Sequence, residues 1–298
     1  MSPWYVQPRA CYTSGVIRAS IAVLAVALGG AAHAAAPDAP PGPSPYRAAA
    51  HVSGKIGARP STSKGELRAH KYVARQFRTA GLEVSFNPFR VPDRGRSRNV
   101  TGKLDTPERC LVVLMAHTDN VPPGLGAIDN ASGVGVLVAL APELAALKPG
   151  CDVWLVATGS EERQVTGLPY HAGAAALVKQ VKSEGRDGDL RFALSVDEVG
   201  LGKRFYLRSP VSGVRDGVEG EILAAARRAG VTVHWARDSS TGNSDHREFE
   251  LAGLPGAVLE VWKGVFPCHH LACDRPRLLE KPAMKRALSV AEEVVRGI

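Results

Sequence analysis

The 298-residue sequence has little of what marks several classes of protein. Five cysteines are too few for a small disulfide-dense domain, and no collagen-like or other internal repeat is present. The 45% hydrophobic and 22% charged residues are the ordinary mixture of a globular protein, which excludes intrinsic disorder. The formal net charge of +8 bears on solubility and steering rather than on a fold or a reaction. We therefore expect a globular chain that can bury a substantial core.

The sequence also lacks an obvious apolar run of the roughly 20 residues that span a bilayer. Near the N-terminus the apolar run is only IAVLAVAL at 21–28, preceded by Arg9 and Arg18 and followed by the tripeptide AHA at 32–34. A positive start, a short apolar run and a small-x-small site are typical of a secretory signal peptide, which we place at residues 1–34. We expect no comparable apolar stretch later in the chain, and no membrane anchor once the signal is removed.

Cleavage at this site changes the composition of the mature chain. Cys11 leaves with the signal, so four cysteines are left, an even number that suits an oxidising compartment. Two arginines and no acid also leave, which lowers the formal charge from +8 to +6. Residues 35–45 are rich in Pro and Ala and predict a disordered leader, and residues 46–298 predict one domain. We therefore expect an exported protein, periplasmic or secreted.

Segments with helical periodicity alternate with short apolar runs from residue 46 onward. The runs predicted as strands are 82–89, 98–104, 110–116, 153–157, 192–196 and 256–262, and the segments predicted as helices are 63–80, 132–147, 168–181 and 282–296. This alternation predicts an α/β fold of three layers, α/β/α, with a mixed sheet whose central strands are parallel and covered on both faces. In such sheets ligands bind beyond the carboxyl ends of the strands.

Acidic residues follow three successive predicted strands. They are Asp119, together with His117, after the first strand, Glu161 and Glu162 after the second, and Asp197 after the third. Alternate residues of an extended segment share a face, so His117 and Asp119 can act as a metal ligand and the anion that orients it. Asp129 lies before the next helix, where it can be a ligand or a helix N-cap. Clustered carboxylates repel one another unless cations neutralise them, so the sequence predicts a metal site.

The segment CHHLACD at 268–274 supplies imidazoles for such a site. A mixture of histidine and carboxylate ligands suits zinc and also fits manganese or cobalt. Cys268 and Cys273 can be further zinc ligands or, in an exported protein, a disulfide that holds the loop carrying the histidines. Cys110 and Cys151 each open a predicted central strand, so they can form a second disulfide or be two buried thiols.

Seven short motifs occur in one order along the chain. They are RNVTG at 98–102, HTD at 117–119, DNASG at 129–133, SEE at 160–162, VDEVG at 196–200, GNSDH at 242–246 and CHHLACD at 268–274. In this order and spacing the chain resembles the M28 family of metallopeptidases, the co-catalytic dizinc aminopeptidases. The resemblance covers most of the mature chain. It implies a zinc-exopeptidase fold and an enzyme that releases N-terminal amino acids from peptides, with a metal-bridging water as the nucleophile.

The resemblance also implies a role for each candidate residue. One Zn²⁺ would be bound by His117 and Asp197, a second by Glu162 and His270, and both by Asp129 as a bridging ligand. Glu161 would be the general base that takes a proton from the bridging water and returns one to the leaving amine, and Asp119 would support His117. The peptide bond after Asp129 would be cis. Two metal ions roughly 3.5–4 Å apart polarise the scissile carbonyl and activate the shared water.

Two positions depart from the family pattern. Where the family has a tyrosine that hydrogen-bonds the tetrahedral intermediate, this chain has His269, whose imidazole can donate the same bond. Where some secreted members have an arginine that helps to position the substrate, this chain has Asn243. Both departures concern the substrate rather than the metal site.

Two other functions fit parts of the sequence. A glutaminyl cyclase has the same fold with a single zinc, and the retained His117 favours the dizinc hydrolase. A non-catalytic basic binding protein would use the four arginines between residues 90 and 98, but that loop lacks interleaved aromatic residues, so we expect no nucleic-acid partner. The sequence disfavours a serine hydrolase because Ser160 is not in a Gly-x-Ser-x-Gly turn and Ser244-Asp245-His246 are contiguous.

Overall fold

The structure, a computed structural model, describes residues 42–162, 170–238, 243–261 and 266–298. All of them belong to one compact unit, residues 35–298. The predicted signal peptide, the predicted leader up to residue 41, Leu168 at the start of one predicted helix and Trp262 at the end of one predicted strand lie outside the described residues.

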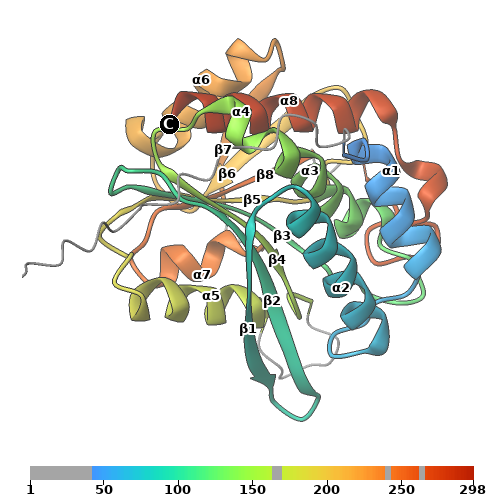
Figure 1. The fold of residues 1–298 in the computed structure, drawn as a ribbon. Coiled ribbons are helices and arrows are strands. Elements are labelled where there is room, and N and C mark those ends of the chain that lie inside the picture. Colours follow the sequence, from blue (N-terminus) through green and yellow to red (C-terminus); the bar gives the residue numbers. More distant parts are fainter. Residues whose placement is uncertain (1–41, 163–169, 239–242, 262–265) are drawn as a thin grey trace, which may run out of the picture. The chain divides into compact units, whose positions relative to one another are not determined.

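An eight-stranded sheet forms the middle layer, with its strands in the order β1-β2-β4-β3-β5-β8-β6-β7 (Figure 1). The strands are β1 Glu83–Val91, β2 Gly95–Leu104, β3 Leu111–His117, β4 Asp152–Thr158, β5 Leu190–Val196, β6 Phe205–Ser209, β7 Val233–Arg237 and β8 Gly256–Val261. The neighbours β4, β3, β5 and β8 are parallel, whereas β2 and β6 join this group through antiparallel pairs. The predicted mixed sheet with parallel central strands is therefore confirmed.

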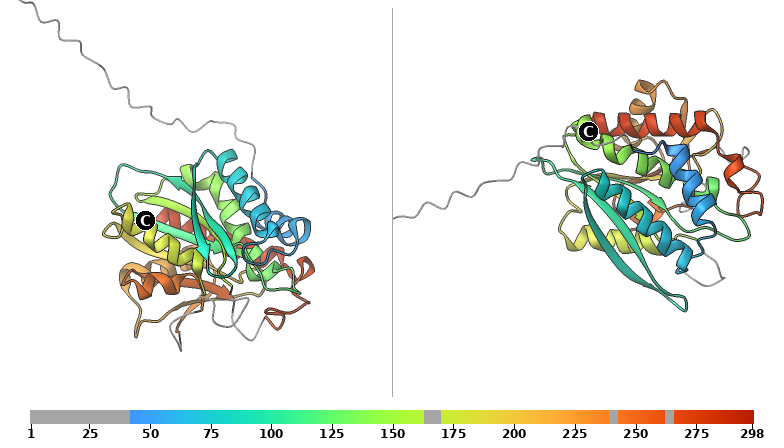
Figure 2. Two further views of the ribbon diagram at one scale, coloured as in Figure 1. Left: turned by 90° about the horizontal axis from the view of Figure 1, so that it is seen from below. Right: turned by 45° about the vertical axis from the view of Figure 1, so that its right-hand side comes forward.

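Helices cover both faces of this sheet (Figures 1 and 2). The α-helices are α1 Pro45–Ala50, α2 Lys64–Thr79, α3 Ser132–Leu140, α4 Leu144–Leu147, α5 Ala172–Ser183, α6 Glu221–Arg228, α7 His246–Leu251 and α8 Lys281–Gly297, and the shorter helical turns are η1 His51–Ile56, η2 Ala127–Ala131, η3 Ala141–Glu143, η4 Asp216–Gly220 and η5 Pro276–Leu278. Helices α2, α3, α6 and α8 lie over one face, and α5 and α7 lie over the other. The three-layer architecture is confirmed.

The two sides of β3 explain why helices lie on both faces. Its even-numbered residues, Val112 to Ala116, join the apolar cluster that contains side chains of α2, α3 and α8. Its odd-numbered residues, Leu111 to Met115, join a second cluster with side chains of α5 and α7. Alternate side chains of a strand point to opposite faces, and all of these are fully buried, so this strand needs a helical layer on each side.

The expectation that no long apolar stretch follows the signal is wrong for residues 127–147. Among the described residues, the 21-residue helical segment Ala127–Leu147 has the length and composition of a membrane span, and an 18-residue window within it has a mean hydropathy of 1.5 and is 72% buried. Every residue of α3 within it is buried, between the sheet and the helices α1 and α8. A helix that packs against protein on every side has apolar residues on every side, as a membrane-spanning helix has against lipid. The segment is the core helix of this fold.

Two predicted boundaries shift for local reasons. The predicted loop at 91–97 is a tight hairpin, because Gly95, at a φ of 119°, lets β2 begin there and pair with Val91. The helix predicted to continue to Leu147 ends as α3 at Leu140. Pro142 follows, and it has no N–H group to continue the α-helical hydrogen bonds.

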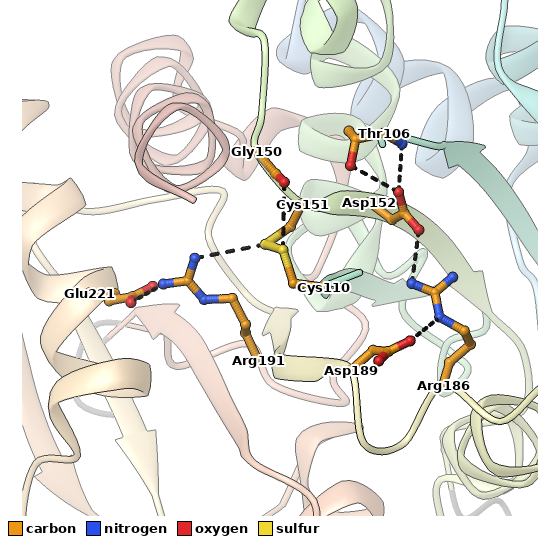
Figure 3. The surroundings of a disulfide bond; sticks show 9 residues. All are labelled: Thr106, Cys110, Gly150, Cys151, Asp152, Arg186, Asp189, Arg191 and Glu221. Carbon is orange, nitrogen blue, oxygen red and sulfur yellow. Dashed lines mark hydrogen bonds and ion pairs between the residues drawn. A yellow bond between two sulfur atoms is a disulfide. The ribbon is translucent and has the colours of Figure 1, made fainter. Parts of the chain in front are cut away.

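The described residues contain two disulfides, so each cysteine pair takes the disulfide alternative. The first joins Cys110 and Cys151, which directly precede the neighbouring strands β3 and β4 (Figure 3). The second joins Cys268 and Cys273 and closes the loop that carries the two histidines at 269–270. The first bridge therefore lies at the amino ends of the central strands, and the second holds a segment that reaches their carboxyl ends.

Candidate active site

The carboxyl ends of β3, β4 and β5 lie level with one another. His117, the last residue of β3, pairs with Thr158, the last residue of β4, and Met115 pairs with Ser195 of β5. Asp197, two residues after Ser195, therefore lies at the height of His117. The side chains that follow these three strands converge on one site.

His117 stands at the centre of a first group of candidate ligands. Its Nε2 atom is 3.2 Å from Asp129 Oδ1 and 3.4 Å from Asp197 Oδ1. The three side chains are buried, and one ligand atom from each lies within 4.8 Å of the others. This group is close enough to hold one metal ion.

His270 and Glu162 form a second group around the other oxygen of Asp129. His270 Nε2 is 3.2 Å from Asp129 Oδ2 and 3.0 Å from Glu162 Oε2. Asp129 thus directs Oδ1 to the first group and Oδ2 to the second, as a carboxylate that bridges two ions would. Two further groupings of ligand atoms within 4.8 Å are His117 with Glu161 and Glu162, and Asp129 with His269 and His270. All five predicted ligands are brought together.

Each group contains a buried carboxylate oxygen that makes no hydrogen bond. Glu162 Oε1 and Asp197 Oδ1 make no hydrogen bond to any described residue, and they are buried from solvent. A buried carboxylate oxygen without a partner is costly, and a coordinated cation satisfies it. Two imidazoles and three carboxylates are a donor set that zinc accepts and that manganese or cobalt also accept. The residues present therefore fit a pair of divalent ions.

The site concentrates negative charge, and its pKa values respond. Burial, reinforced by Asp129, raises the pKa of Glu162 well above its ordinary value. Burial also raises the pKa of Glu198 to about 7. Burial alone would lower the pKa of His117, but the carboxylate of Glu161 and its neighbours raise it instead. Protein groups alone leave this site short of positive charge, which bound cations would supply.

Asp274 and Asn130 hold Asp129 in place. The Asp274 carboxylate accepts hydrogen bonds of 2.8–3.2 Å from the three successive backbone N–H groups of residues 127–129. Asn130 Nδ2 donates to the Val196 carbonyl at the end of β5, at 2.9 Å. The peptide bond between Asp129 and Asn130 is cis, as the family resemblance implies.

A fully buried arginine, Arg59, organises the loop between β3 and Asp129. Its guanidinium donates hydrogen bonds of 2.7–3.3 Å to the backbone carbonyls of Val52, Gly57, Thr118, Leu125 and Gly126. Its backbone N–H donates to Asn120 Oδ1 at 2.6 Å. The Val52 and Gly126 carbonyls also accept a backbone N–H, from Gly57 and Ala131, so the arginine adds a side-chain donor that joins η1 to the loop after β3.

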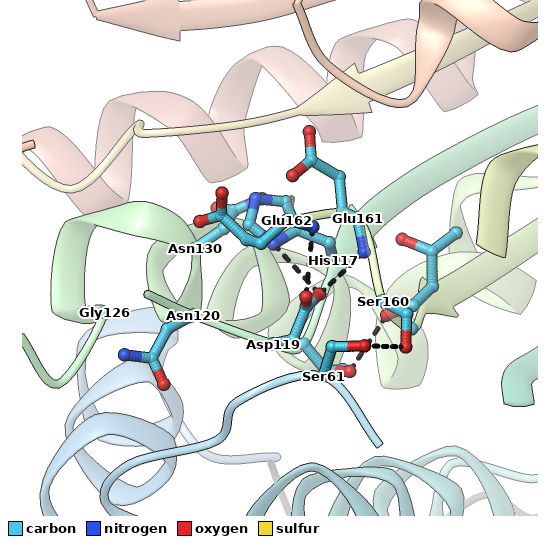
Figure 4. A network of polar contacts seen from close by, with 12 residues as sticks. Ser61, His117, Asp119, Asn120, Gly126, Asn130, Ser160, Glu161 and Glu162 are labelled. Atoms are coloured by element: carbon cyan, nitrogen blue, oxygen red, sulfur yellow. Dashed lines mark hydrogen bonds and ion pairs between the residues drawn. The ribbon is translucent and has the colours of Figure 1, made fainter. Parts of the chain in front are cut away.

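Asp119 contacts both His117 and the turn after β4 (Figure 4). Its Oδ1 atom lies 3.6 Å from His117 Nδ1. The same carboxylate accepts hydrogen bonds from the backbone N–H groups of Glu161, at 3.0 Å, and Glu162, at 3.1 Å. The predicted partner of the first histidine therefore also shapes the turn that presents both glutamates.

A second buried acid, Glu66 of α2, supports the same turn. Its Oε1 atom accepts hydrogen bonds from the backbone N–H (2.7 Å) and the hydroxyl (3.1 Å) of Ser160. Ser61 Oγ donates to Ser160 Oγ at 2.7 Å (Figure 4). Ser63 caps the start of α2, since its Oγ accepts from the Glu66 N–H at 3.2 Å. One glutamate thus joins the start of α2 to the end of β4.

Left-handed backbone conformations gather around the site. Seven non-glycine residues among those described have a positive φ, and four of them border the site, namely Ser160, His171, Glu198 and His270, at φ values of 52°, 54°, 51° and 57°. Residues with a Cβ atom rarely adopt this region, and each costs about 1 kcal/mol or more. The surrounding packing has to hold them there, and such conformations cluster at functional sites.

A pocket of about 450 Å³ opens onto the two ligand groups. Besides the five ligands and Glu161, its lining consists of Tyr170, Glu198, Arg208, Asn243, Glu260, Phe266 and His269. His269 Nδ1 lies 2.6 Å from Glu198 Oε1, and the His269 ring stacks on that of His270. Both departures from the family pattern, His269 and Asn243, therefore line the pocket.

Two further residues near Glu161 have no counterpart in the sequence-based predictions. His171 Nε2 lies 3.2 Å from Glu161 Oε1, and His171 Nδ1 lies 3.4 Å from Glu248 Oε1. His171 directly precedes α5, and Glu248 belongs to α7. No motif marks either residue, and the sequence contains no signal that would have paired them.

Comparison with known proteins identifies the family. The family model described as Peptidase family M28 matches residues 99–295. The chain belongs to peptidase family M28. It is a metallopeptidase, a hydrolase of peptide bonds, and the resemblance seen in the sequence motifs is confirmed.

Two relatives of this M28 peptidase are similar over different shares of their sequences. The alkaline phosphatase isozyme conversion protein of Escherichia coli (strain K12) is 26% identical over 267 residues, which cover 77% of this chain and 74% of the relative. Aminopeptidase YwaD of Bacillus subtilis (strain 168) is 26% identical over 184 residues, which cover 59% of this chain and 38% of the relative.

Solved structures share the fold of the M28 peptidase. BSAP, a zinc aminopeptidase from Bacillus subtilis, matches with a TM-score of 0.76 at 16% identity, over 84% of this chain and 93% of the other. A glutaminyl cyclase from Bacteroides thetaiotaomicron matches with a TM-score of 0.74 at 20% identity, over 88% of this chain and 98% of the other. One fold therefore accommodates both activities, and the choice between them depends on the site.

Proposed function

We propose that this M28 peptidase is a dizinc aminopeptidase that releases N-terminal amino acids from peptides. The observation that carries the proposal is the position of Asp129, whose two oxygens each lie 3.2 Å from a histidine nitrogen on either side. A carboxylate between two complete ligand groups supports two ions rather than one. Zinc suits these ligands, and similar structures include zinc aminopeptidases.

In this proposal each ligand group holds one ion, the first through His117 and Asp197, the second through Glu162 and His270, with Asp129 shared. When bound, the two ions polarise the scissile carbonyl and lower the pKa of a shared water. Glu161 takes the proton of the attacking water and delivers a proton to the leaving amine. His269 donates a hydrogen bond to the oxygen of the tetrahedral intermediate.

The pocket wall supports recognition of a free amino terminus. Glu198 and Glu260 line the pocket beside the ligands, and a carboxylate is the natural partner of an α-ammonium group. Arg208 lies 3.0 Å from Glu260 and fixes that carboxylate from behind. A larger groove of about 1100 Å³, which shares Tyr170 and Asn243 with the pocket, offers room for the rest of a peptide.

A single-zinc glutaminyl cyclase is the second candidate, since cyclases have this fold. It predicts one zinc at saturation and formation of pyroglutamate from N-terminal glutamine. The dizinc aminopeptidase predicts two zinc ions and release of free amino acids from aminoacyl substrates. Metal analysis with both kinds of substrate separates the two candidates.

We also propose that the protein is exported, with residues 1–34 as the signal peptide, residues 35–45 as the leader and residues 46–298 as the catalytic domain. The four described cysteines all form disulfides, which supports an oxidising compartment. N-terminal sequencing of protein from the cell exterior or periplasm should begin at Ala35. Full-length protein confined to the cytosol would contradict export.

The decisive test of the reaction is Glu161→Gln. We expect about two zinc ions per chain and a kcat that is about 10²–10⁴-fold lower, because the proton acceptor is lost while the ligands are kept. Glu108→Gln, at an exposed glutamate, is the matched control and should not change kcat. Asp129→Ala should lose both ions or their coupling. Full wild-type activity in the presence of a chelator would contradict a metal-dependent reaction.

A further inference from the structure

The carboxylate of Glu161 contacts an imidazole that belongs to neither ligand group. His171 Nε2 is 3.2 Å from Glu161 Oε1, and the two side chains are only 2% and 7% exposed. His171 is absent from all the groupings of candidate metal ligands among the described residues. Its position beside the proposed general base therefore calls for a different role.

The backbone fixes this imidazole against the turn that carries Glu161. The His171 N–H donates to the Glu161 carbonyl at 2.8 Å, and the Ala172 N–H donates to the Ser160 carbonyl at 3.0 Å. At Gly173 an added Cβ would lie 2.3 Å from a backbone carbonyl of the same turn, so the start of α5 is pressed against the end of β4. His171 itself adopts a φ of 54°, a conformation that this packing has to maintain.

A second carboxylate holds the far side of the imidazole. His171 Nδ1 lies 3.4 Å from Glu248 Oε1 on α7, and Arg247 Nη1 lies 2.8 Å from the same oxygen. Burial opposes protonation of the ring, but Glu161 and Glu248 together raise the pKa of His171 to about 10. The ring therefore carries a positive charge at neutral pH and has a carboxylate on each side, Glu161 next to Nε2 and Glu248 next to Nδ1.

We propose that His171, supported by Glu248, is the positioning residue that sets the orientation of the Glu161 carboxylate for proton transfer. The inference rests on the proposed function of Glu161. The ion pair of 3.2 Å between Nε2 and one carboxylate oxygen restricts rotation of the Glu161 side chain and leaves the other oxygen to receive the proton of the water. Proton transfer depends steeply on this geometry, so the contribution falls on kcat rather than on substrate binding.

The test compares His171→Leu, His171→Gln and Glu248→Gln by kcat, KM and zinc content. His171→Leu removes the donor and should lower kcat about 10–100-fold, with KM within about threefold and zinc content unchanged. His171→Gln places an amide N–H near the position of Nε2 and should restore most of the loss. Glu248→Gln weakens the support of the ring and should lower kcat about 3–10-fold. His234→Leu, at an exposed histidine of β7, is the control and should leave kcat unchanged.

A double variant shows whether the effect passes through Glu161. In the Glu161→Gln background, His171→Leu should change the residual kcat by less than about twofold, because the residue that it positions is already gone. The inference is overturned if His171→Leu acts equally in both backgrounds, if its loss of activity follows loss of zinc, or if kcat is unchanged. Should His171→Leu fail to fold, a wild-type kcat in Glu248→Gln overturns it. The proposed function is judged separately, by Glu161→Gln alone.

Discussion

Removing the two disulfides one at a time is expected to separate stability from activity. Cys110–Cys151 spans 41 residues of sequence, whereas Cys268–Cys273 spans 5. A cross-link removes entropy from the unfolded chain, and the amount grows with the length of the loop that it closes. The chain-entropy relation gives about 4 kcal/mol of stabilisation for the first bridge and about 2 kcal/mol for the second.

The first bridge contributes more to stability, but we expect the second bridge to matter more for activity, because of where each bridge lies. The seven residues of β3, at ~3.3 Å each, place Cys110 about 23 Å from His117 at the far end of the strand. The second bridge instead closes the loop that contains His270. Replacing Cys110 and Cys151 by alanine should therefore leave kcat within about twofold. Replacing Cys268 and Cys273 by alanine should lower kcat and zinc affinity at least about 10-fold, because the ligand loop is no longer closed.

Urea unfolding measures the first effect, and zinc titration with aminoacyl substrate hydrolysis measures the second. Unfolding has to be followed in the presence of a chelator, because bound metal adds its own stabilisation to the folded state. The reasoning is refuted if the variant without Cys268–Cys273 is the less stable of the two in chelator. It is equally refuted if the variant without Cys110–Cys151 loses activity at a temperature where it is folded.

Three further predictions concern buried polar groups. Arg59→Met removes the guanidinium donor from five backbone carbonyls, of which Val52 and Gly126 keep a backbone N–H donor, and should lower the free energy of unfolding by about 3–5 kcal/mol in urea, whereas Arg109→Met, at an 86% exposed arginine, should have no measurable effect. His70 is buried, with Nε2 2.8 Å from Thr118 Oγ1, and burial lowers the pKa of its imidazole to about 4. As the pH falls below 6.5, this imidazole is therefore protonated in the unfolded chain before it is protonated in the folded protein. Its stability contribution is present above pH 6.5 and is lost towards pH 4, and the wild type should lose about 2 kcal/mol more than His70→Gln between pH 7 and pH 5 in unfolding titrations. Asp274→Asn places an amide group among three N–H donors and should weaken zinc binding about 10–100-fold in competition with a chelating dye; an unchanged affinity would show that Asp274 does not position the bridging ligand.

The candidate ligands could be predicted because the fold places them by a simple rule. Buried parallel strands are apolar along their whole length, so the first charged residue after each run marks a strand end, as His117 and Asp197 do. The register of β3, β4 and β5 then brings these residues to one height. The bridging role of Asp129 could be predicted only from the family resemblance, because no rule of this kind places a residue in a loop.

Other parts could not be predicted because only three-dimensional packing defines them. His171 and Glu248 lie 77 residues apart and meet only once α5 and α7 cover the same face of the sheet. Elements α1, β6, α6, β7 and α7 were not predicted either. Strand β7 has five residues, VHWAR, of which none is buried, so it lacks the apolar run that marks the central strands. Helix α7 has six residues, too few for a helical period to be recognised.

The core helix segment 127–147 has a consequence for export of this chain. A secreted protein crosses the membrane unfolded, and in that state these 21 residues present the translocation channel with the hydropathy of a membrane span. Asp129, Pro142 and Glu143 interrupt the apolar sequence and disfavour lateral insertion into the lipid. In the proposed export, the acid proposed to bridge the metals would therefore also help to release the chain from the membrane, and Asp129→Leu should leave a larger membrane-retained fraction than Asp129→Asn.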